Sequence, residues 1–365
     1  MRYAPEWSPD GKRLAFNDKD GKLYVLTLED KKLVEIADDT RGRVRDYAWS
    51  PNGGHLAFSL AGSNNFRSIY IWSVSDGQRR RITSELFNEF NPAWDPEGNY
   101  LYYLSRREFA PQRASVEWNY FIDRETGIFA LALRKDVKHP FPPESDEVSV
   151  EEEETEEKDK KDKEAEKEGK KEREYIKIDF DGLAERVARV PVPPDNLGGL
   201  KATKEHLLYI RRGAFYLGRE SDQSPSLQIF SMKDRKVSTL AEKVNAYVLS
   251  QDGSKALVRH PEGFKLYDAS PKGKDSAKSV STRNLMLDRV PVQEWAQIFD
   301  EVWRRYRDFF YVKNLHGYDW EALREQYRPL LAHVAHRVDL NYVIGEMIAE
   351  LNVSHAYVWG GDYEI

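Results

Sequence analysis

The stretch that decides the fold is Trp7–Gly11, with the sequence WSPDG, because it returns along the chain. Close copies are Trp49–Gly53 (WSPNG) and Trp94–Gly98 (WDPEG), and a worn copy is Leu249–Gly253 (LSQDG). The first three begin 42 and 45 residues apart, which is the spacing of one four-stranded propeller blade. The repeat therefore predicts a mainly β protein built around a β-propeller.

Each copy has the composition of a tight turn between two strands. Proline presets the backbone, an Asp, Asn or Glu precedes glycine, and glycine takes the positive φ that reverses the chain. Short apolar strands such as Leu14–Phe16 and Leu56–Phe58 follow. The tryptophans are expected to pack between blades and to form no site. An all-β sandwich is the weaker alternative, because it does not need the same turn at a fixed spacing.

We expect the propeller to cover residues 1–284 and a second domain to cover residues 285–365. The insert at residues 144–174 is rich in Glu and Lys, and 21 of the 24 residues from Glu151 to Glu174 are charged. Mixed charged blocks gain little from burial, so this insert is predicted to be disordered. Lys272–Ser281 is small and charged and is predicted to be a linker.

Beyond Val292 the hydrophobic period changes from 2 to about 3.6. The apolar residues from Trp295 to Phe310 fall on one helix face, which predicts a helical start to the second domain. Three further elements are expected: helices Trp320–Leu331 and Leu340–Leu351, capped by Asp319 and Asp339, and a strand over Ser354–Gly361.

Composition excludes several classes of function. Cysteine is absent, so disulfides and thiolate chemistry are ruled out and a reducing, cytoplasmic setting is expected. The net charge is -6, of which the 13 acidic and 8 basic residues of 151–174 supply -5, so no basic excess predicts nucleic-acid binding. No apolar run is long enough to span a membrane. Metal, nucleotide and G-x-S-x-G motifs are missing, so neither a cofactor nor a metal site is expected.

Of the eight histidines, one invites a chemical reading. Strand, turn, pre-proline, loop or helix-end positions account for the others: His55, His139, His206, His260, His316, His333 and His336. His355 follows Ser354 directly, and an imidazole next to a hydroxyl can act as a base near neutral pH. On the residues alone, a single Ser-His pair before an apolar strand is more often structural.

Several runs near the end of the chain occur together and in order: Phe299–Arg304, Arg307–Tyr311, His316–Trp320, Tyr327–Leu331 and Glu350–Ala356. As a set they resemble the first core domain of tricorn protease homologs. The preceding WSPDG-type propeller with its Glu/Lys-rich insert is similar to the domain that comes before this core. The resemblance implies a propeller followed by part of an α+β serine-peptidase core domain, whose first part is helical.

The resemblance also implies a function: a serine-type peptidase that hydrolyses oligopeptides, assembles as a homo-oligomer, and uses the propeller as a substrate filter. His355 would be the general base, and Ser354 would orient its imidazole together with a downstream glutamate. The nucleophilic serine of the family lies in a second core domain beyond a PDZ domain. Since none of that is in this chain, the 365 residues are expected to be an inactive fragment.

Two alternatives stay open at this point. One is a non-catalytic propeller module that binds peptides or proteins. The other is a peptidase of the C-terminal-processing type, whose core is similar, although the large propeller argues against it.

Overall fold

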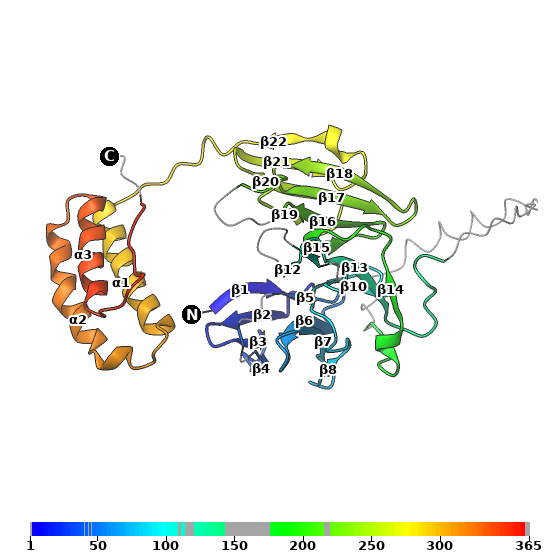
Figure 1. Ribbon diagram of the computed structural model, residues 1–365, viewed down its shortest axis with the longest axis horizontal. Coiled ribbons are helices and arrows are strands. Elements are labelled where there is room, and N and C mark those ends of the chain that lie inside the picture. Colours follow the sequence, from blue (N-terminus) through cyan, green and yellow to red (C-terminus); the bar gives the residue numbers. More distant parts are fainter. Residues whose placement is uncertain are drawn as a thin grey trace, which may run out of the picture. The chain divides into compact units, whose positions relative to one another are not determined.

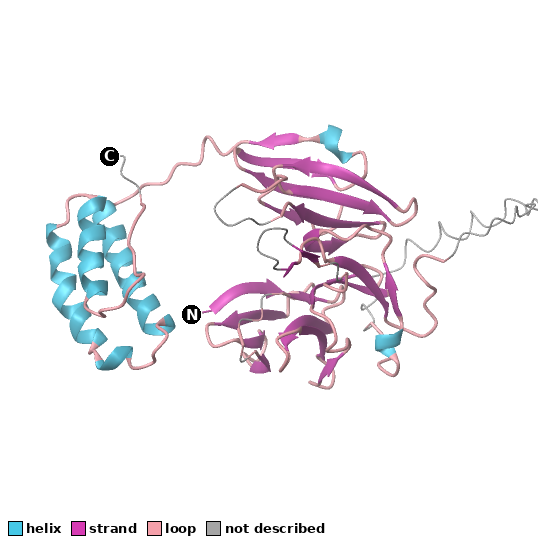
Figure 2. Cartoon of the chain, in the orientation of Figure 1, coloured by secondary structure: helices cyan, strands magenta, loops and turns pink. Residues whose placement is uncertain are grey.

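The computed structural model describes residues 2–39, 41–42, 44, 46–108, 111–113, 120–142, 176–214 and 220–361. They divide into two compact units, Arg2–Ser281 and Thr282–Ile365. The first unit is built of strands and the second of helices (Figures 1 and 2). The charged insert at residues 144–174 lies outside the described residues.

Five four-stranded antiparallel sheets form the first unit. In chain order the blades are β1–β4 (Arg2–Trp7, Arg13–Asp18, Lys22–Thr27, Leu33–Asp38), β5–β8 (Tyr47–Trp49, His55–Ala61, Arg67–Ser73, Arg79–Arg81), β9, β10, β13 and β14 (Glu89–Trp94, Tyr100–Ser105, Gly127–Ala132, Val187–Arg189), β15–β18 (Asn196–Ala202, His206–Arg212, Ser226–Ser231, Lys236–Glu242) and β19–β22 (Ala246–Leu249, Lys255–His260, Gly263–Asp268, Lys278–Val280). A short hairpin, β11 (Gln112–Arg113) and β12 (Tyr120–Phe121), lies between β10 and β13. The prediction of a β-propeller is confirmed, with five blades in the described residues.

The repeated turn works as its composition predicts. In the first blade Ser8 Oγ accepts a hydrogen bond of 2.9 Å from the backbone N–H of Arg13, and Gly11 has φ 70°. Ser50 and Ser250 make the same contact in the second and fifth blades. A short acceptor after the Trp position therefore closes each turn, and only glycine adopts the left-handed backbone there without strain.

The fourth blade has a turn that the repeat search missed. Here Ala202 takes the Trp position, and Thr203 Oγ1 accepts a hydrogen bond of 3.1 Å from the N–H of His206. This turn is shorter and uses neither proline nor a left-handed glycine. A side-chain oxygen acceptor is thus the shared feature, supplied by a hydroxyl in four blades and by the Asp95 carboxylate in the third, where it accepts from the Asn99 N–H at 3.0 Å.

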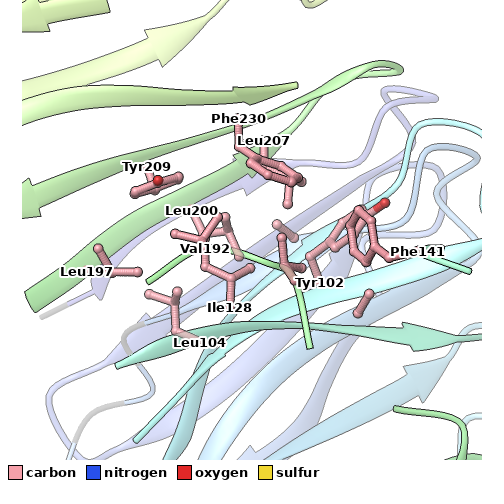
Figure 3. Packing of buried hydrophobic residues seen from close by; sticks show 13 residues of the cluster. Tyr102, Leu104, Ile128, Phe141, Val192, Leu197, Leu200, Leu207, Tyr209 and Phe230 are labelled. Atoms are coloured by element: carbon pink, nitrogen blue, oxygen red, sulfur yellow. The ribbon is translucent and has the colours of Figure 1, made fainter. Parts of the chain in front are cut away.

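Apolar clusters join consecutive blades. Figure 3 shows the one between the third and fourth blades, where Leu104 and Ile128 share a core with Leu200, Leu207 and Phe230. Similar clusters lie between the first and second, second and third, and fourth and fifth blades. Each fully buried side chain of this kind contributes roughly 1.5–3 kcal/mol to folding. The blades are therefore held by the burial of their faces against each other.

Tryptophans of the repeat add a hydrogen bond to this packing. The Trp49 indole N–H donates to the carbonyl of Glu6 at 3.2 Å, and that of Trp94 donates to the carbonyl of Ala48 at 2.9 Å. Each bond reaches the inner strand of the preceding blade. The expected packing between blades is confirmed for these two residues, but it is wrong for Trp7, whose side chain is 60% exposed.

The second unit is a small helical bundle. Its elements are α1 (Pro291–Phe309), the 3-10 helix η4 (Leu315–Gly317), α2 (Trp320–Tyr327), the 3-10 helix η5 (Arg328–His333) and α3 (Arg337–Ala349). Trp303 and Trp320 are buried and pair reciprocally, because each indole N–H donates to the other residue's carbonyl, at 2.8 and 2.9 Å. These two hydrogen bonds, each from an indole N–H to a backbone carbonyl, hold α1 against α2.

Two boundaries differ from the sequence prediction. Lys272–Ser281 is not a linker, because the 3-10 helix η3 (Gly273–Ser276) and β22 lie within it and β22 pairs with β21 as the outer strand of the fifth blade. Helix α3 begins before Asp339: His336 is the N-cap, and the Asp339 carboxylate accepts from the His336 N–H at 2.9 Å. Asp339 therefore acts at the third helical position of a capping box.

The predicted strand at Ser354–Gly361 is also wrong, since none of the described residues there belongs to a strand. The segment is extended: Ala356 and Val358 pack against the helical core, while Tyr357 and Trp359 are 67% and 78% exposed. It alternates like a strand, but it is paired with no partner strand among the described residues.

The tryptophan bridge between blades can be tested with a matched pair of variants. Trp94→Phe removes the indole donor from a buried bond, so we expect it to destabilise the propeller by about 1–2 kcal/mol more than Trp7→Phe. Thermal unfolding followed by circular dichroism measures the difference. Equal midpoints for the two variants would show that the bridge contributes nothing.

A second prediction concerns acid. Burial lowers the pKa of His55 to about 4, and its Nδ1 has no hydrogen-bond partner among the described residues. An unfolded chain takes up this proton near pH 6.5, so the folded state should lose stability as the pH falls from about 6.5 to about 4.

His55→Phe should remove that loss, worth about 2 kcal/mol near pH 4.5. The measurement is the unfolding midpoint against pH, with exposed His333→Gln as the control. The same slope in His55→Phe as in the unaltered chain contradicts the assignment.

Candidate functional site

The chain after helix α3 carries both site residues that the sequence predicts. Leu351 is buried and ends the helical packing, and Ser354 and His355 follow in an exposed turn. Two side-chain bonds hold the segment: Tyr327 Oη donates to Glu350 Oε1 at 2.7 Å, and Asn341 Nδ2 donates to the Gly360 carbonyl at 3.0 Å. The same glutamate raises the pKa of Tyr327 to about 12. The segment is thus anchored to the bundle at both ends.

The imidazole of His355 is exposed and faces one aromatic neighbour. Its Nδ1 lies 3.4 Å from Tyr357 Oη, and the two rings meet edge to face with centroids 6.3 Å apart. Ser354 and His355 are adjacent, yet no hydrogen bond joins their side chains in the part of the chain that the structure describes. The two residues are therefore neighbours in the structure, but their side chains do not form the hydrogen bond that a catalytic Ser-His pair requires.

Ser354 lines a cavity of about 690 Å³ on the helical unit. The other lining residues are Tyr311, His316, Tyr318, Leu351, Asn352 and Val353. His316, which the sequence placed among ordinary loop histidines, contributes its ring here and lies 2.6 Å from Tyr311 Oη through Nε2. The sequence feature that points to His316 is the number of aromatic residues on either side of it, since an exposed loop seldom contains so many.

Backbone strain collects around this cavity. Leu315, His316, Asn352 and His355 all have left-handed backbones, with φ of 48°, 59°, 50° and 61°. Residues other than glycine hold such conformations only where the surrounding structure determines them, and they gather at functional sites. Both segments that meet at the cavity therefore contain backbone conformations that are uncommon for residues other than glycine.

The propeller carries a second cavity, of about 780 Å³, at the ends of its inner strands. All five blades contribute to it: Pro9, Ala48, Trp49, Pro51, Asn52, Pro92, Ala93, Trp94, Pro96, Glu97, Lys201, Ala202 and Gln251, with Ile176 of the segment before β14. This axial cavity thus forms a mouth where the inner strands of the five described blades come together, and the prolines of the repeated turn line it.

Charge at this mouth is sparse and mixed. Glu97 pairs with Lys204 at 3.1 Å, and Lys201 lines the cavity from the fourth blade. Burial raises the pKa of Glu6, and the positive charge of Lys201 partly opposes that shift. A rim of prolines and aromatic residues with few charges suits an extended peptide more than a strongly charged ligand.

In the part of the chain that the structure describes, no group of three or more His, Asp or Glu side chains could hold a metal ion. None of the helices described is both long and apolar enough to cross a membrane.

Comparisons with known proteins give consistent results. Residues 1–270 match the family described as the tricorn protease second beta propeller domain, and residues 291–349 match the tricorn protease C1 domain. Tricorn protease homolog 1 of Streptomyces coelicolor is 26% identical over 96% of this chain and 33% of its own length. The tricorn protease of Thermoplasma volcanium is 25% identical over 98% of this chain and 34% of its own.

A solved structure supports the same fold. The crystal structure of the tricorn protease superposes with a TM-score of 0.81 at 22% identity, covering 99% of this chain and 34% of that one. The chain therefore spans about a third of the length of the relatives it matches. Because the matching propeller family alone covers well over half of its 365 residues, the chain belongs to the tricorn protease family.

Proposed function

We propose that the protein containing this chain is a serine-type peptidase that hydrolyses oligopeptides, with His355 as its general base. The observation that carries the proposal is an exposed imidazole on a fixed left-handed backbone, beside a cavity lined by Ser354, in a chain of the tricorn protease family. The nucleophilic serine would come from outside these 365 residues.

The chemistry asks two things of His355. One ring nitrogen takes the proton of the attacking serine hydroxyl and later gives it to the leaving amine. The other nitrogen has to be held by a hydrogen bond, so that a single tautomer faces the nucleophile. Nδ1 is the nitrogen that lies near Tyr357 Oη, which leaves Nε2 as the proposed proton acceptor.

Ser354 is proposed to orient this imidazole. It forms no hydrogen bond to His355 among the described residues, so the role requires rotation of one of the two side chains. Both side chains are exposed, which leaves room for that rotation. A downstream glutamate, outside this chain, would complete the hydrogen bonding at the imidazole.

The propeller is proposed to filter substrates. Its axial cavity of about 780 Å³ would hold a short stretch of extended peptide, whereas a folded domain occupies a far larger volume. Homo-oligomeric assembly and action in the cytoplasm are further parts of the proposal, and they rest on family membership alone.

A second candidate function is a non-catalytic module that binds peptides. The axial cavity favours it, because the propeller alone builds that cavity. The two candidates differ in whether the protein hydrolyses peptides at all, because only the peptidase needs His355 as a base.

His355→Ala in the protein that contains this chain should lower peptide hydrolysis by about a thousandfold or more, because the serine loses its proton acceptor. Hydrolysis of a fluorogenic peptide measures the loss, and circular dichroism checks the fold. His333→Ala, which changes an exposed histidine of the same unit, is the control. Full turnover in His355→Ala would refute the assignment of His355 as the base, and no turnover in the unaltered protein would refute the peptidase assignment.

The filter can be tested by blocking the axial mouth. These 365 residues contain no cysteine, so Gln251→Cys, in the parent protein with any cysteines elsewhere replaced by serine, gives one reactive thiol at the rim of the cavity. A bulky maleimide there should strongly slow hydrolysis of long peptides. Glu29→Cys, in the exposed turn between β3 and β4, is the labelled control. Equal rates for the two labelled proteins count against a passage through the propeller.

A further inference from the structure

We propose that Tyr327 and Asn341 are positioning residues for His355, the proposed general base. Tyr327 ends α2 and Asn341 lies on α3, and each bonds one side of the segment that carries the imidazole. The inference rests on the proposed peptidase function and adds to it the side chains that set where the base stands.

The segment that carries His355 needs such support. None of the described residues from Ser354 to Gly361 belongs to a strand, so no ladder of sheet hydrogen bonds holds them. A general base has to come within hydrogen-bond reach of the proton it takes, and a misplacement of about 1 Å can slow a reaction about a hundredfold. The position of His355 therefore has to be set by contacts with the helices.

Apolar contacts place the segment on the bundle. Val353, Ala356 and Val358 pack against the helical core. Burial of apolar surface is non-directional, so these contacts hold the segment down without setting its position along the helices. Hydrogen bonds depend steeply on distance and angle, and they supply the missing restraint.

Tyr327 holds the chain before the base. Its hydroxyl donates to Glu350 Oε1 at 2.7 Å, and Glu350 is the C-cap of α3, five residues before His355. A hydrogen bond to a carboxylate is stronger than one between neutral groups. The bond to Glu350 raises the pKa of Tyr327 to about 12, so the hydroxyl keeps its proton throughout the pH range in which a histidine acts as a base.

Asn341 holds the chain after the base. Its Nδ2 donates to the Gly360 carbonyl at 3.0 Å, five residues beyond His355, and its Oδ1 accepts from Arg337 Nε at 3.2 Å. An amide whose donor and acceptor ends are both bonded has a defined orientation. The segment is therefore restrained by a side chain on either side of the base.

Neither side chain belongs to the fully buried core of the bundle. That core contains residues such as Phe299, Leu340 and Met347, whereas Tyr327 and Asn341 are half-buried at its edge. Loss of one hydrogen bond there should free the segment while the bundle stays folded.

The first measurement needs no turnover. The 365-residue chain is labelled with [13Cε1]histidine, and the His355 signal is assigned with His355→Gln. Tyr327→Phe and Asn341→Leu remove the hydrogen bonds at nearly constant volume, so each should shift the His355 signal and leave the unfolding midpoint within a few degrees. Tyr342→Phe, at an exposed tyrosine of α3, should leave the signal in place. An unmoved His355 signal in both variants overturns the proposal.

Turnover in the parent protein supplies the second measurement. Tyr327→Phe and Asn341→Leu should each lower kcat for a short fluorogenic peptide about tenfold and leave KM within about twofold, because they misplace the base and touch no substrate. Glu350→Leu breaks the same bond as Tyr327→Phe, so combining these two should cost no more than either alone. Glu350→Gln keeps an acceptor for the phenol and should recover most of the loss seen in Glu350→Leu.

Leu323→Ala is the matched control, because it loosens the packing of α2 and removes neither bond. An equal loss of kcat in Leu323→Ala at the same fall in unfolding midpoint overturns the positioning roles, and so does a rise in KM with unchanged kcat in Tyr327→Phe and Asn341→Leu. These failures differ from a failure of the peptidase assignment, which shows as no turnover in the unaltered protein. They also differ from a wrong base, which shows as full turnover in His355→Ala.

Discussion

The burial of one blade face against the next is the interaction on which the rest of this molecule depends. A four-stranded sheet has two apolar faces, and the side chains of a single blade cannot shield both of them from water. Here the shared clusters cover them, as where Leu104 of the third blade packs with Leu207 and Phe230 of the fourth. The axial cavity exists only because this packing sets the blades around a common axis.

The packing of blade against blade explains why the WSPDG-type repeat could be recognised in the sequence. The indole of Trp49 or Trp94 fills the space between two blades and binds the carbonyl of the preceding inner strand. The turn that follows needs a short acceptor and a reversal of the chain, so residue types are restricted at each position. In the fourth blade a shorter turn needs only Thr203. The fifth blade is joined to the fourth through Tyr247, whose hydroxyl lies 2.7 and 2.9 Å from the carbonyl oxygens of Gly199 and Leu208 and donates its one hydrogen between them. Where a different turn or a different side chain makes the same contacts, the WSPDG-type motif is lost although the four-stranded blade is retained.

Elements with a local sequence pattern could be predicted, whereas contacts between distant segments could not. Helix α1 followed from its apolar face, because burial of Phe299 and Trp303 demands that spacing. His316 could not be found in this way. Its place beside Ser354 depends on how η4 folds against the end of α3, which is a contact between segments some forty residues apart in the chain. The predicted start of α3 was wrong for a local reason: His336 Nδ1 accepts from the Val338 N–H at 3.2 Å and so takes the N-cap position that was expected for Asp339.

The segment Ser354–Gly361, which was predicted to be a strand and is not one, determines how the candidate base is exposed. Alternation of buried and exposed residues reports an extended backbone over an apolar surface, and it does not require a second strand. Here Ala356 and Val358 contact the helical core, while Tyr357 stays outside with its hydroxyl near His355. The extended segment therefore anchors His355 through its inward residues and leaves the imidazole exposed, as the proposed role of His355 as a base requires.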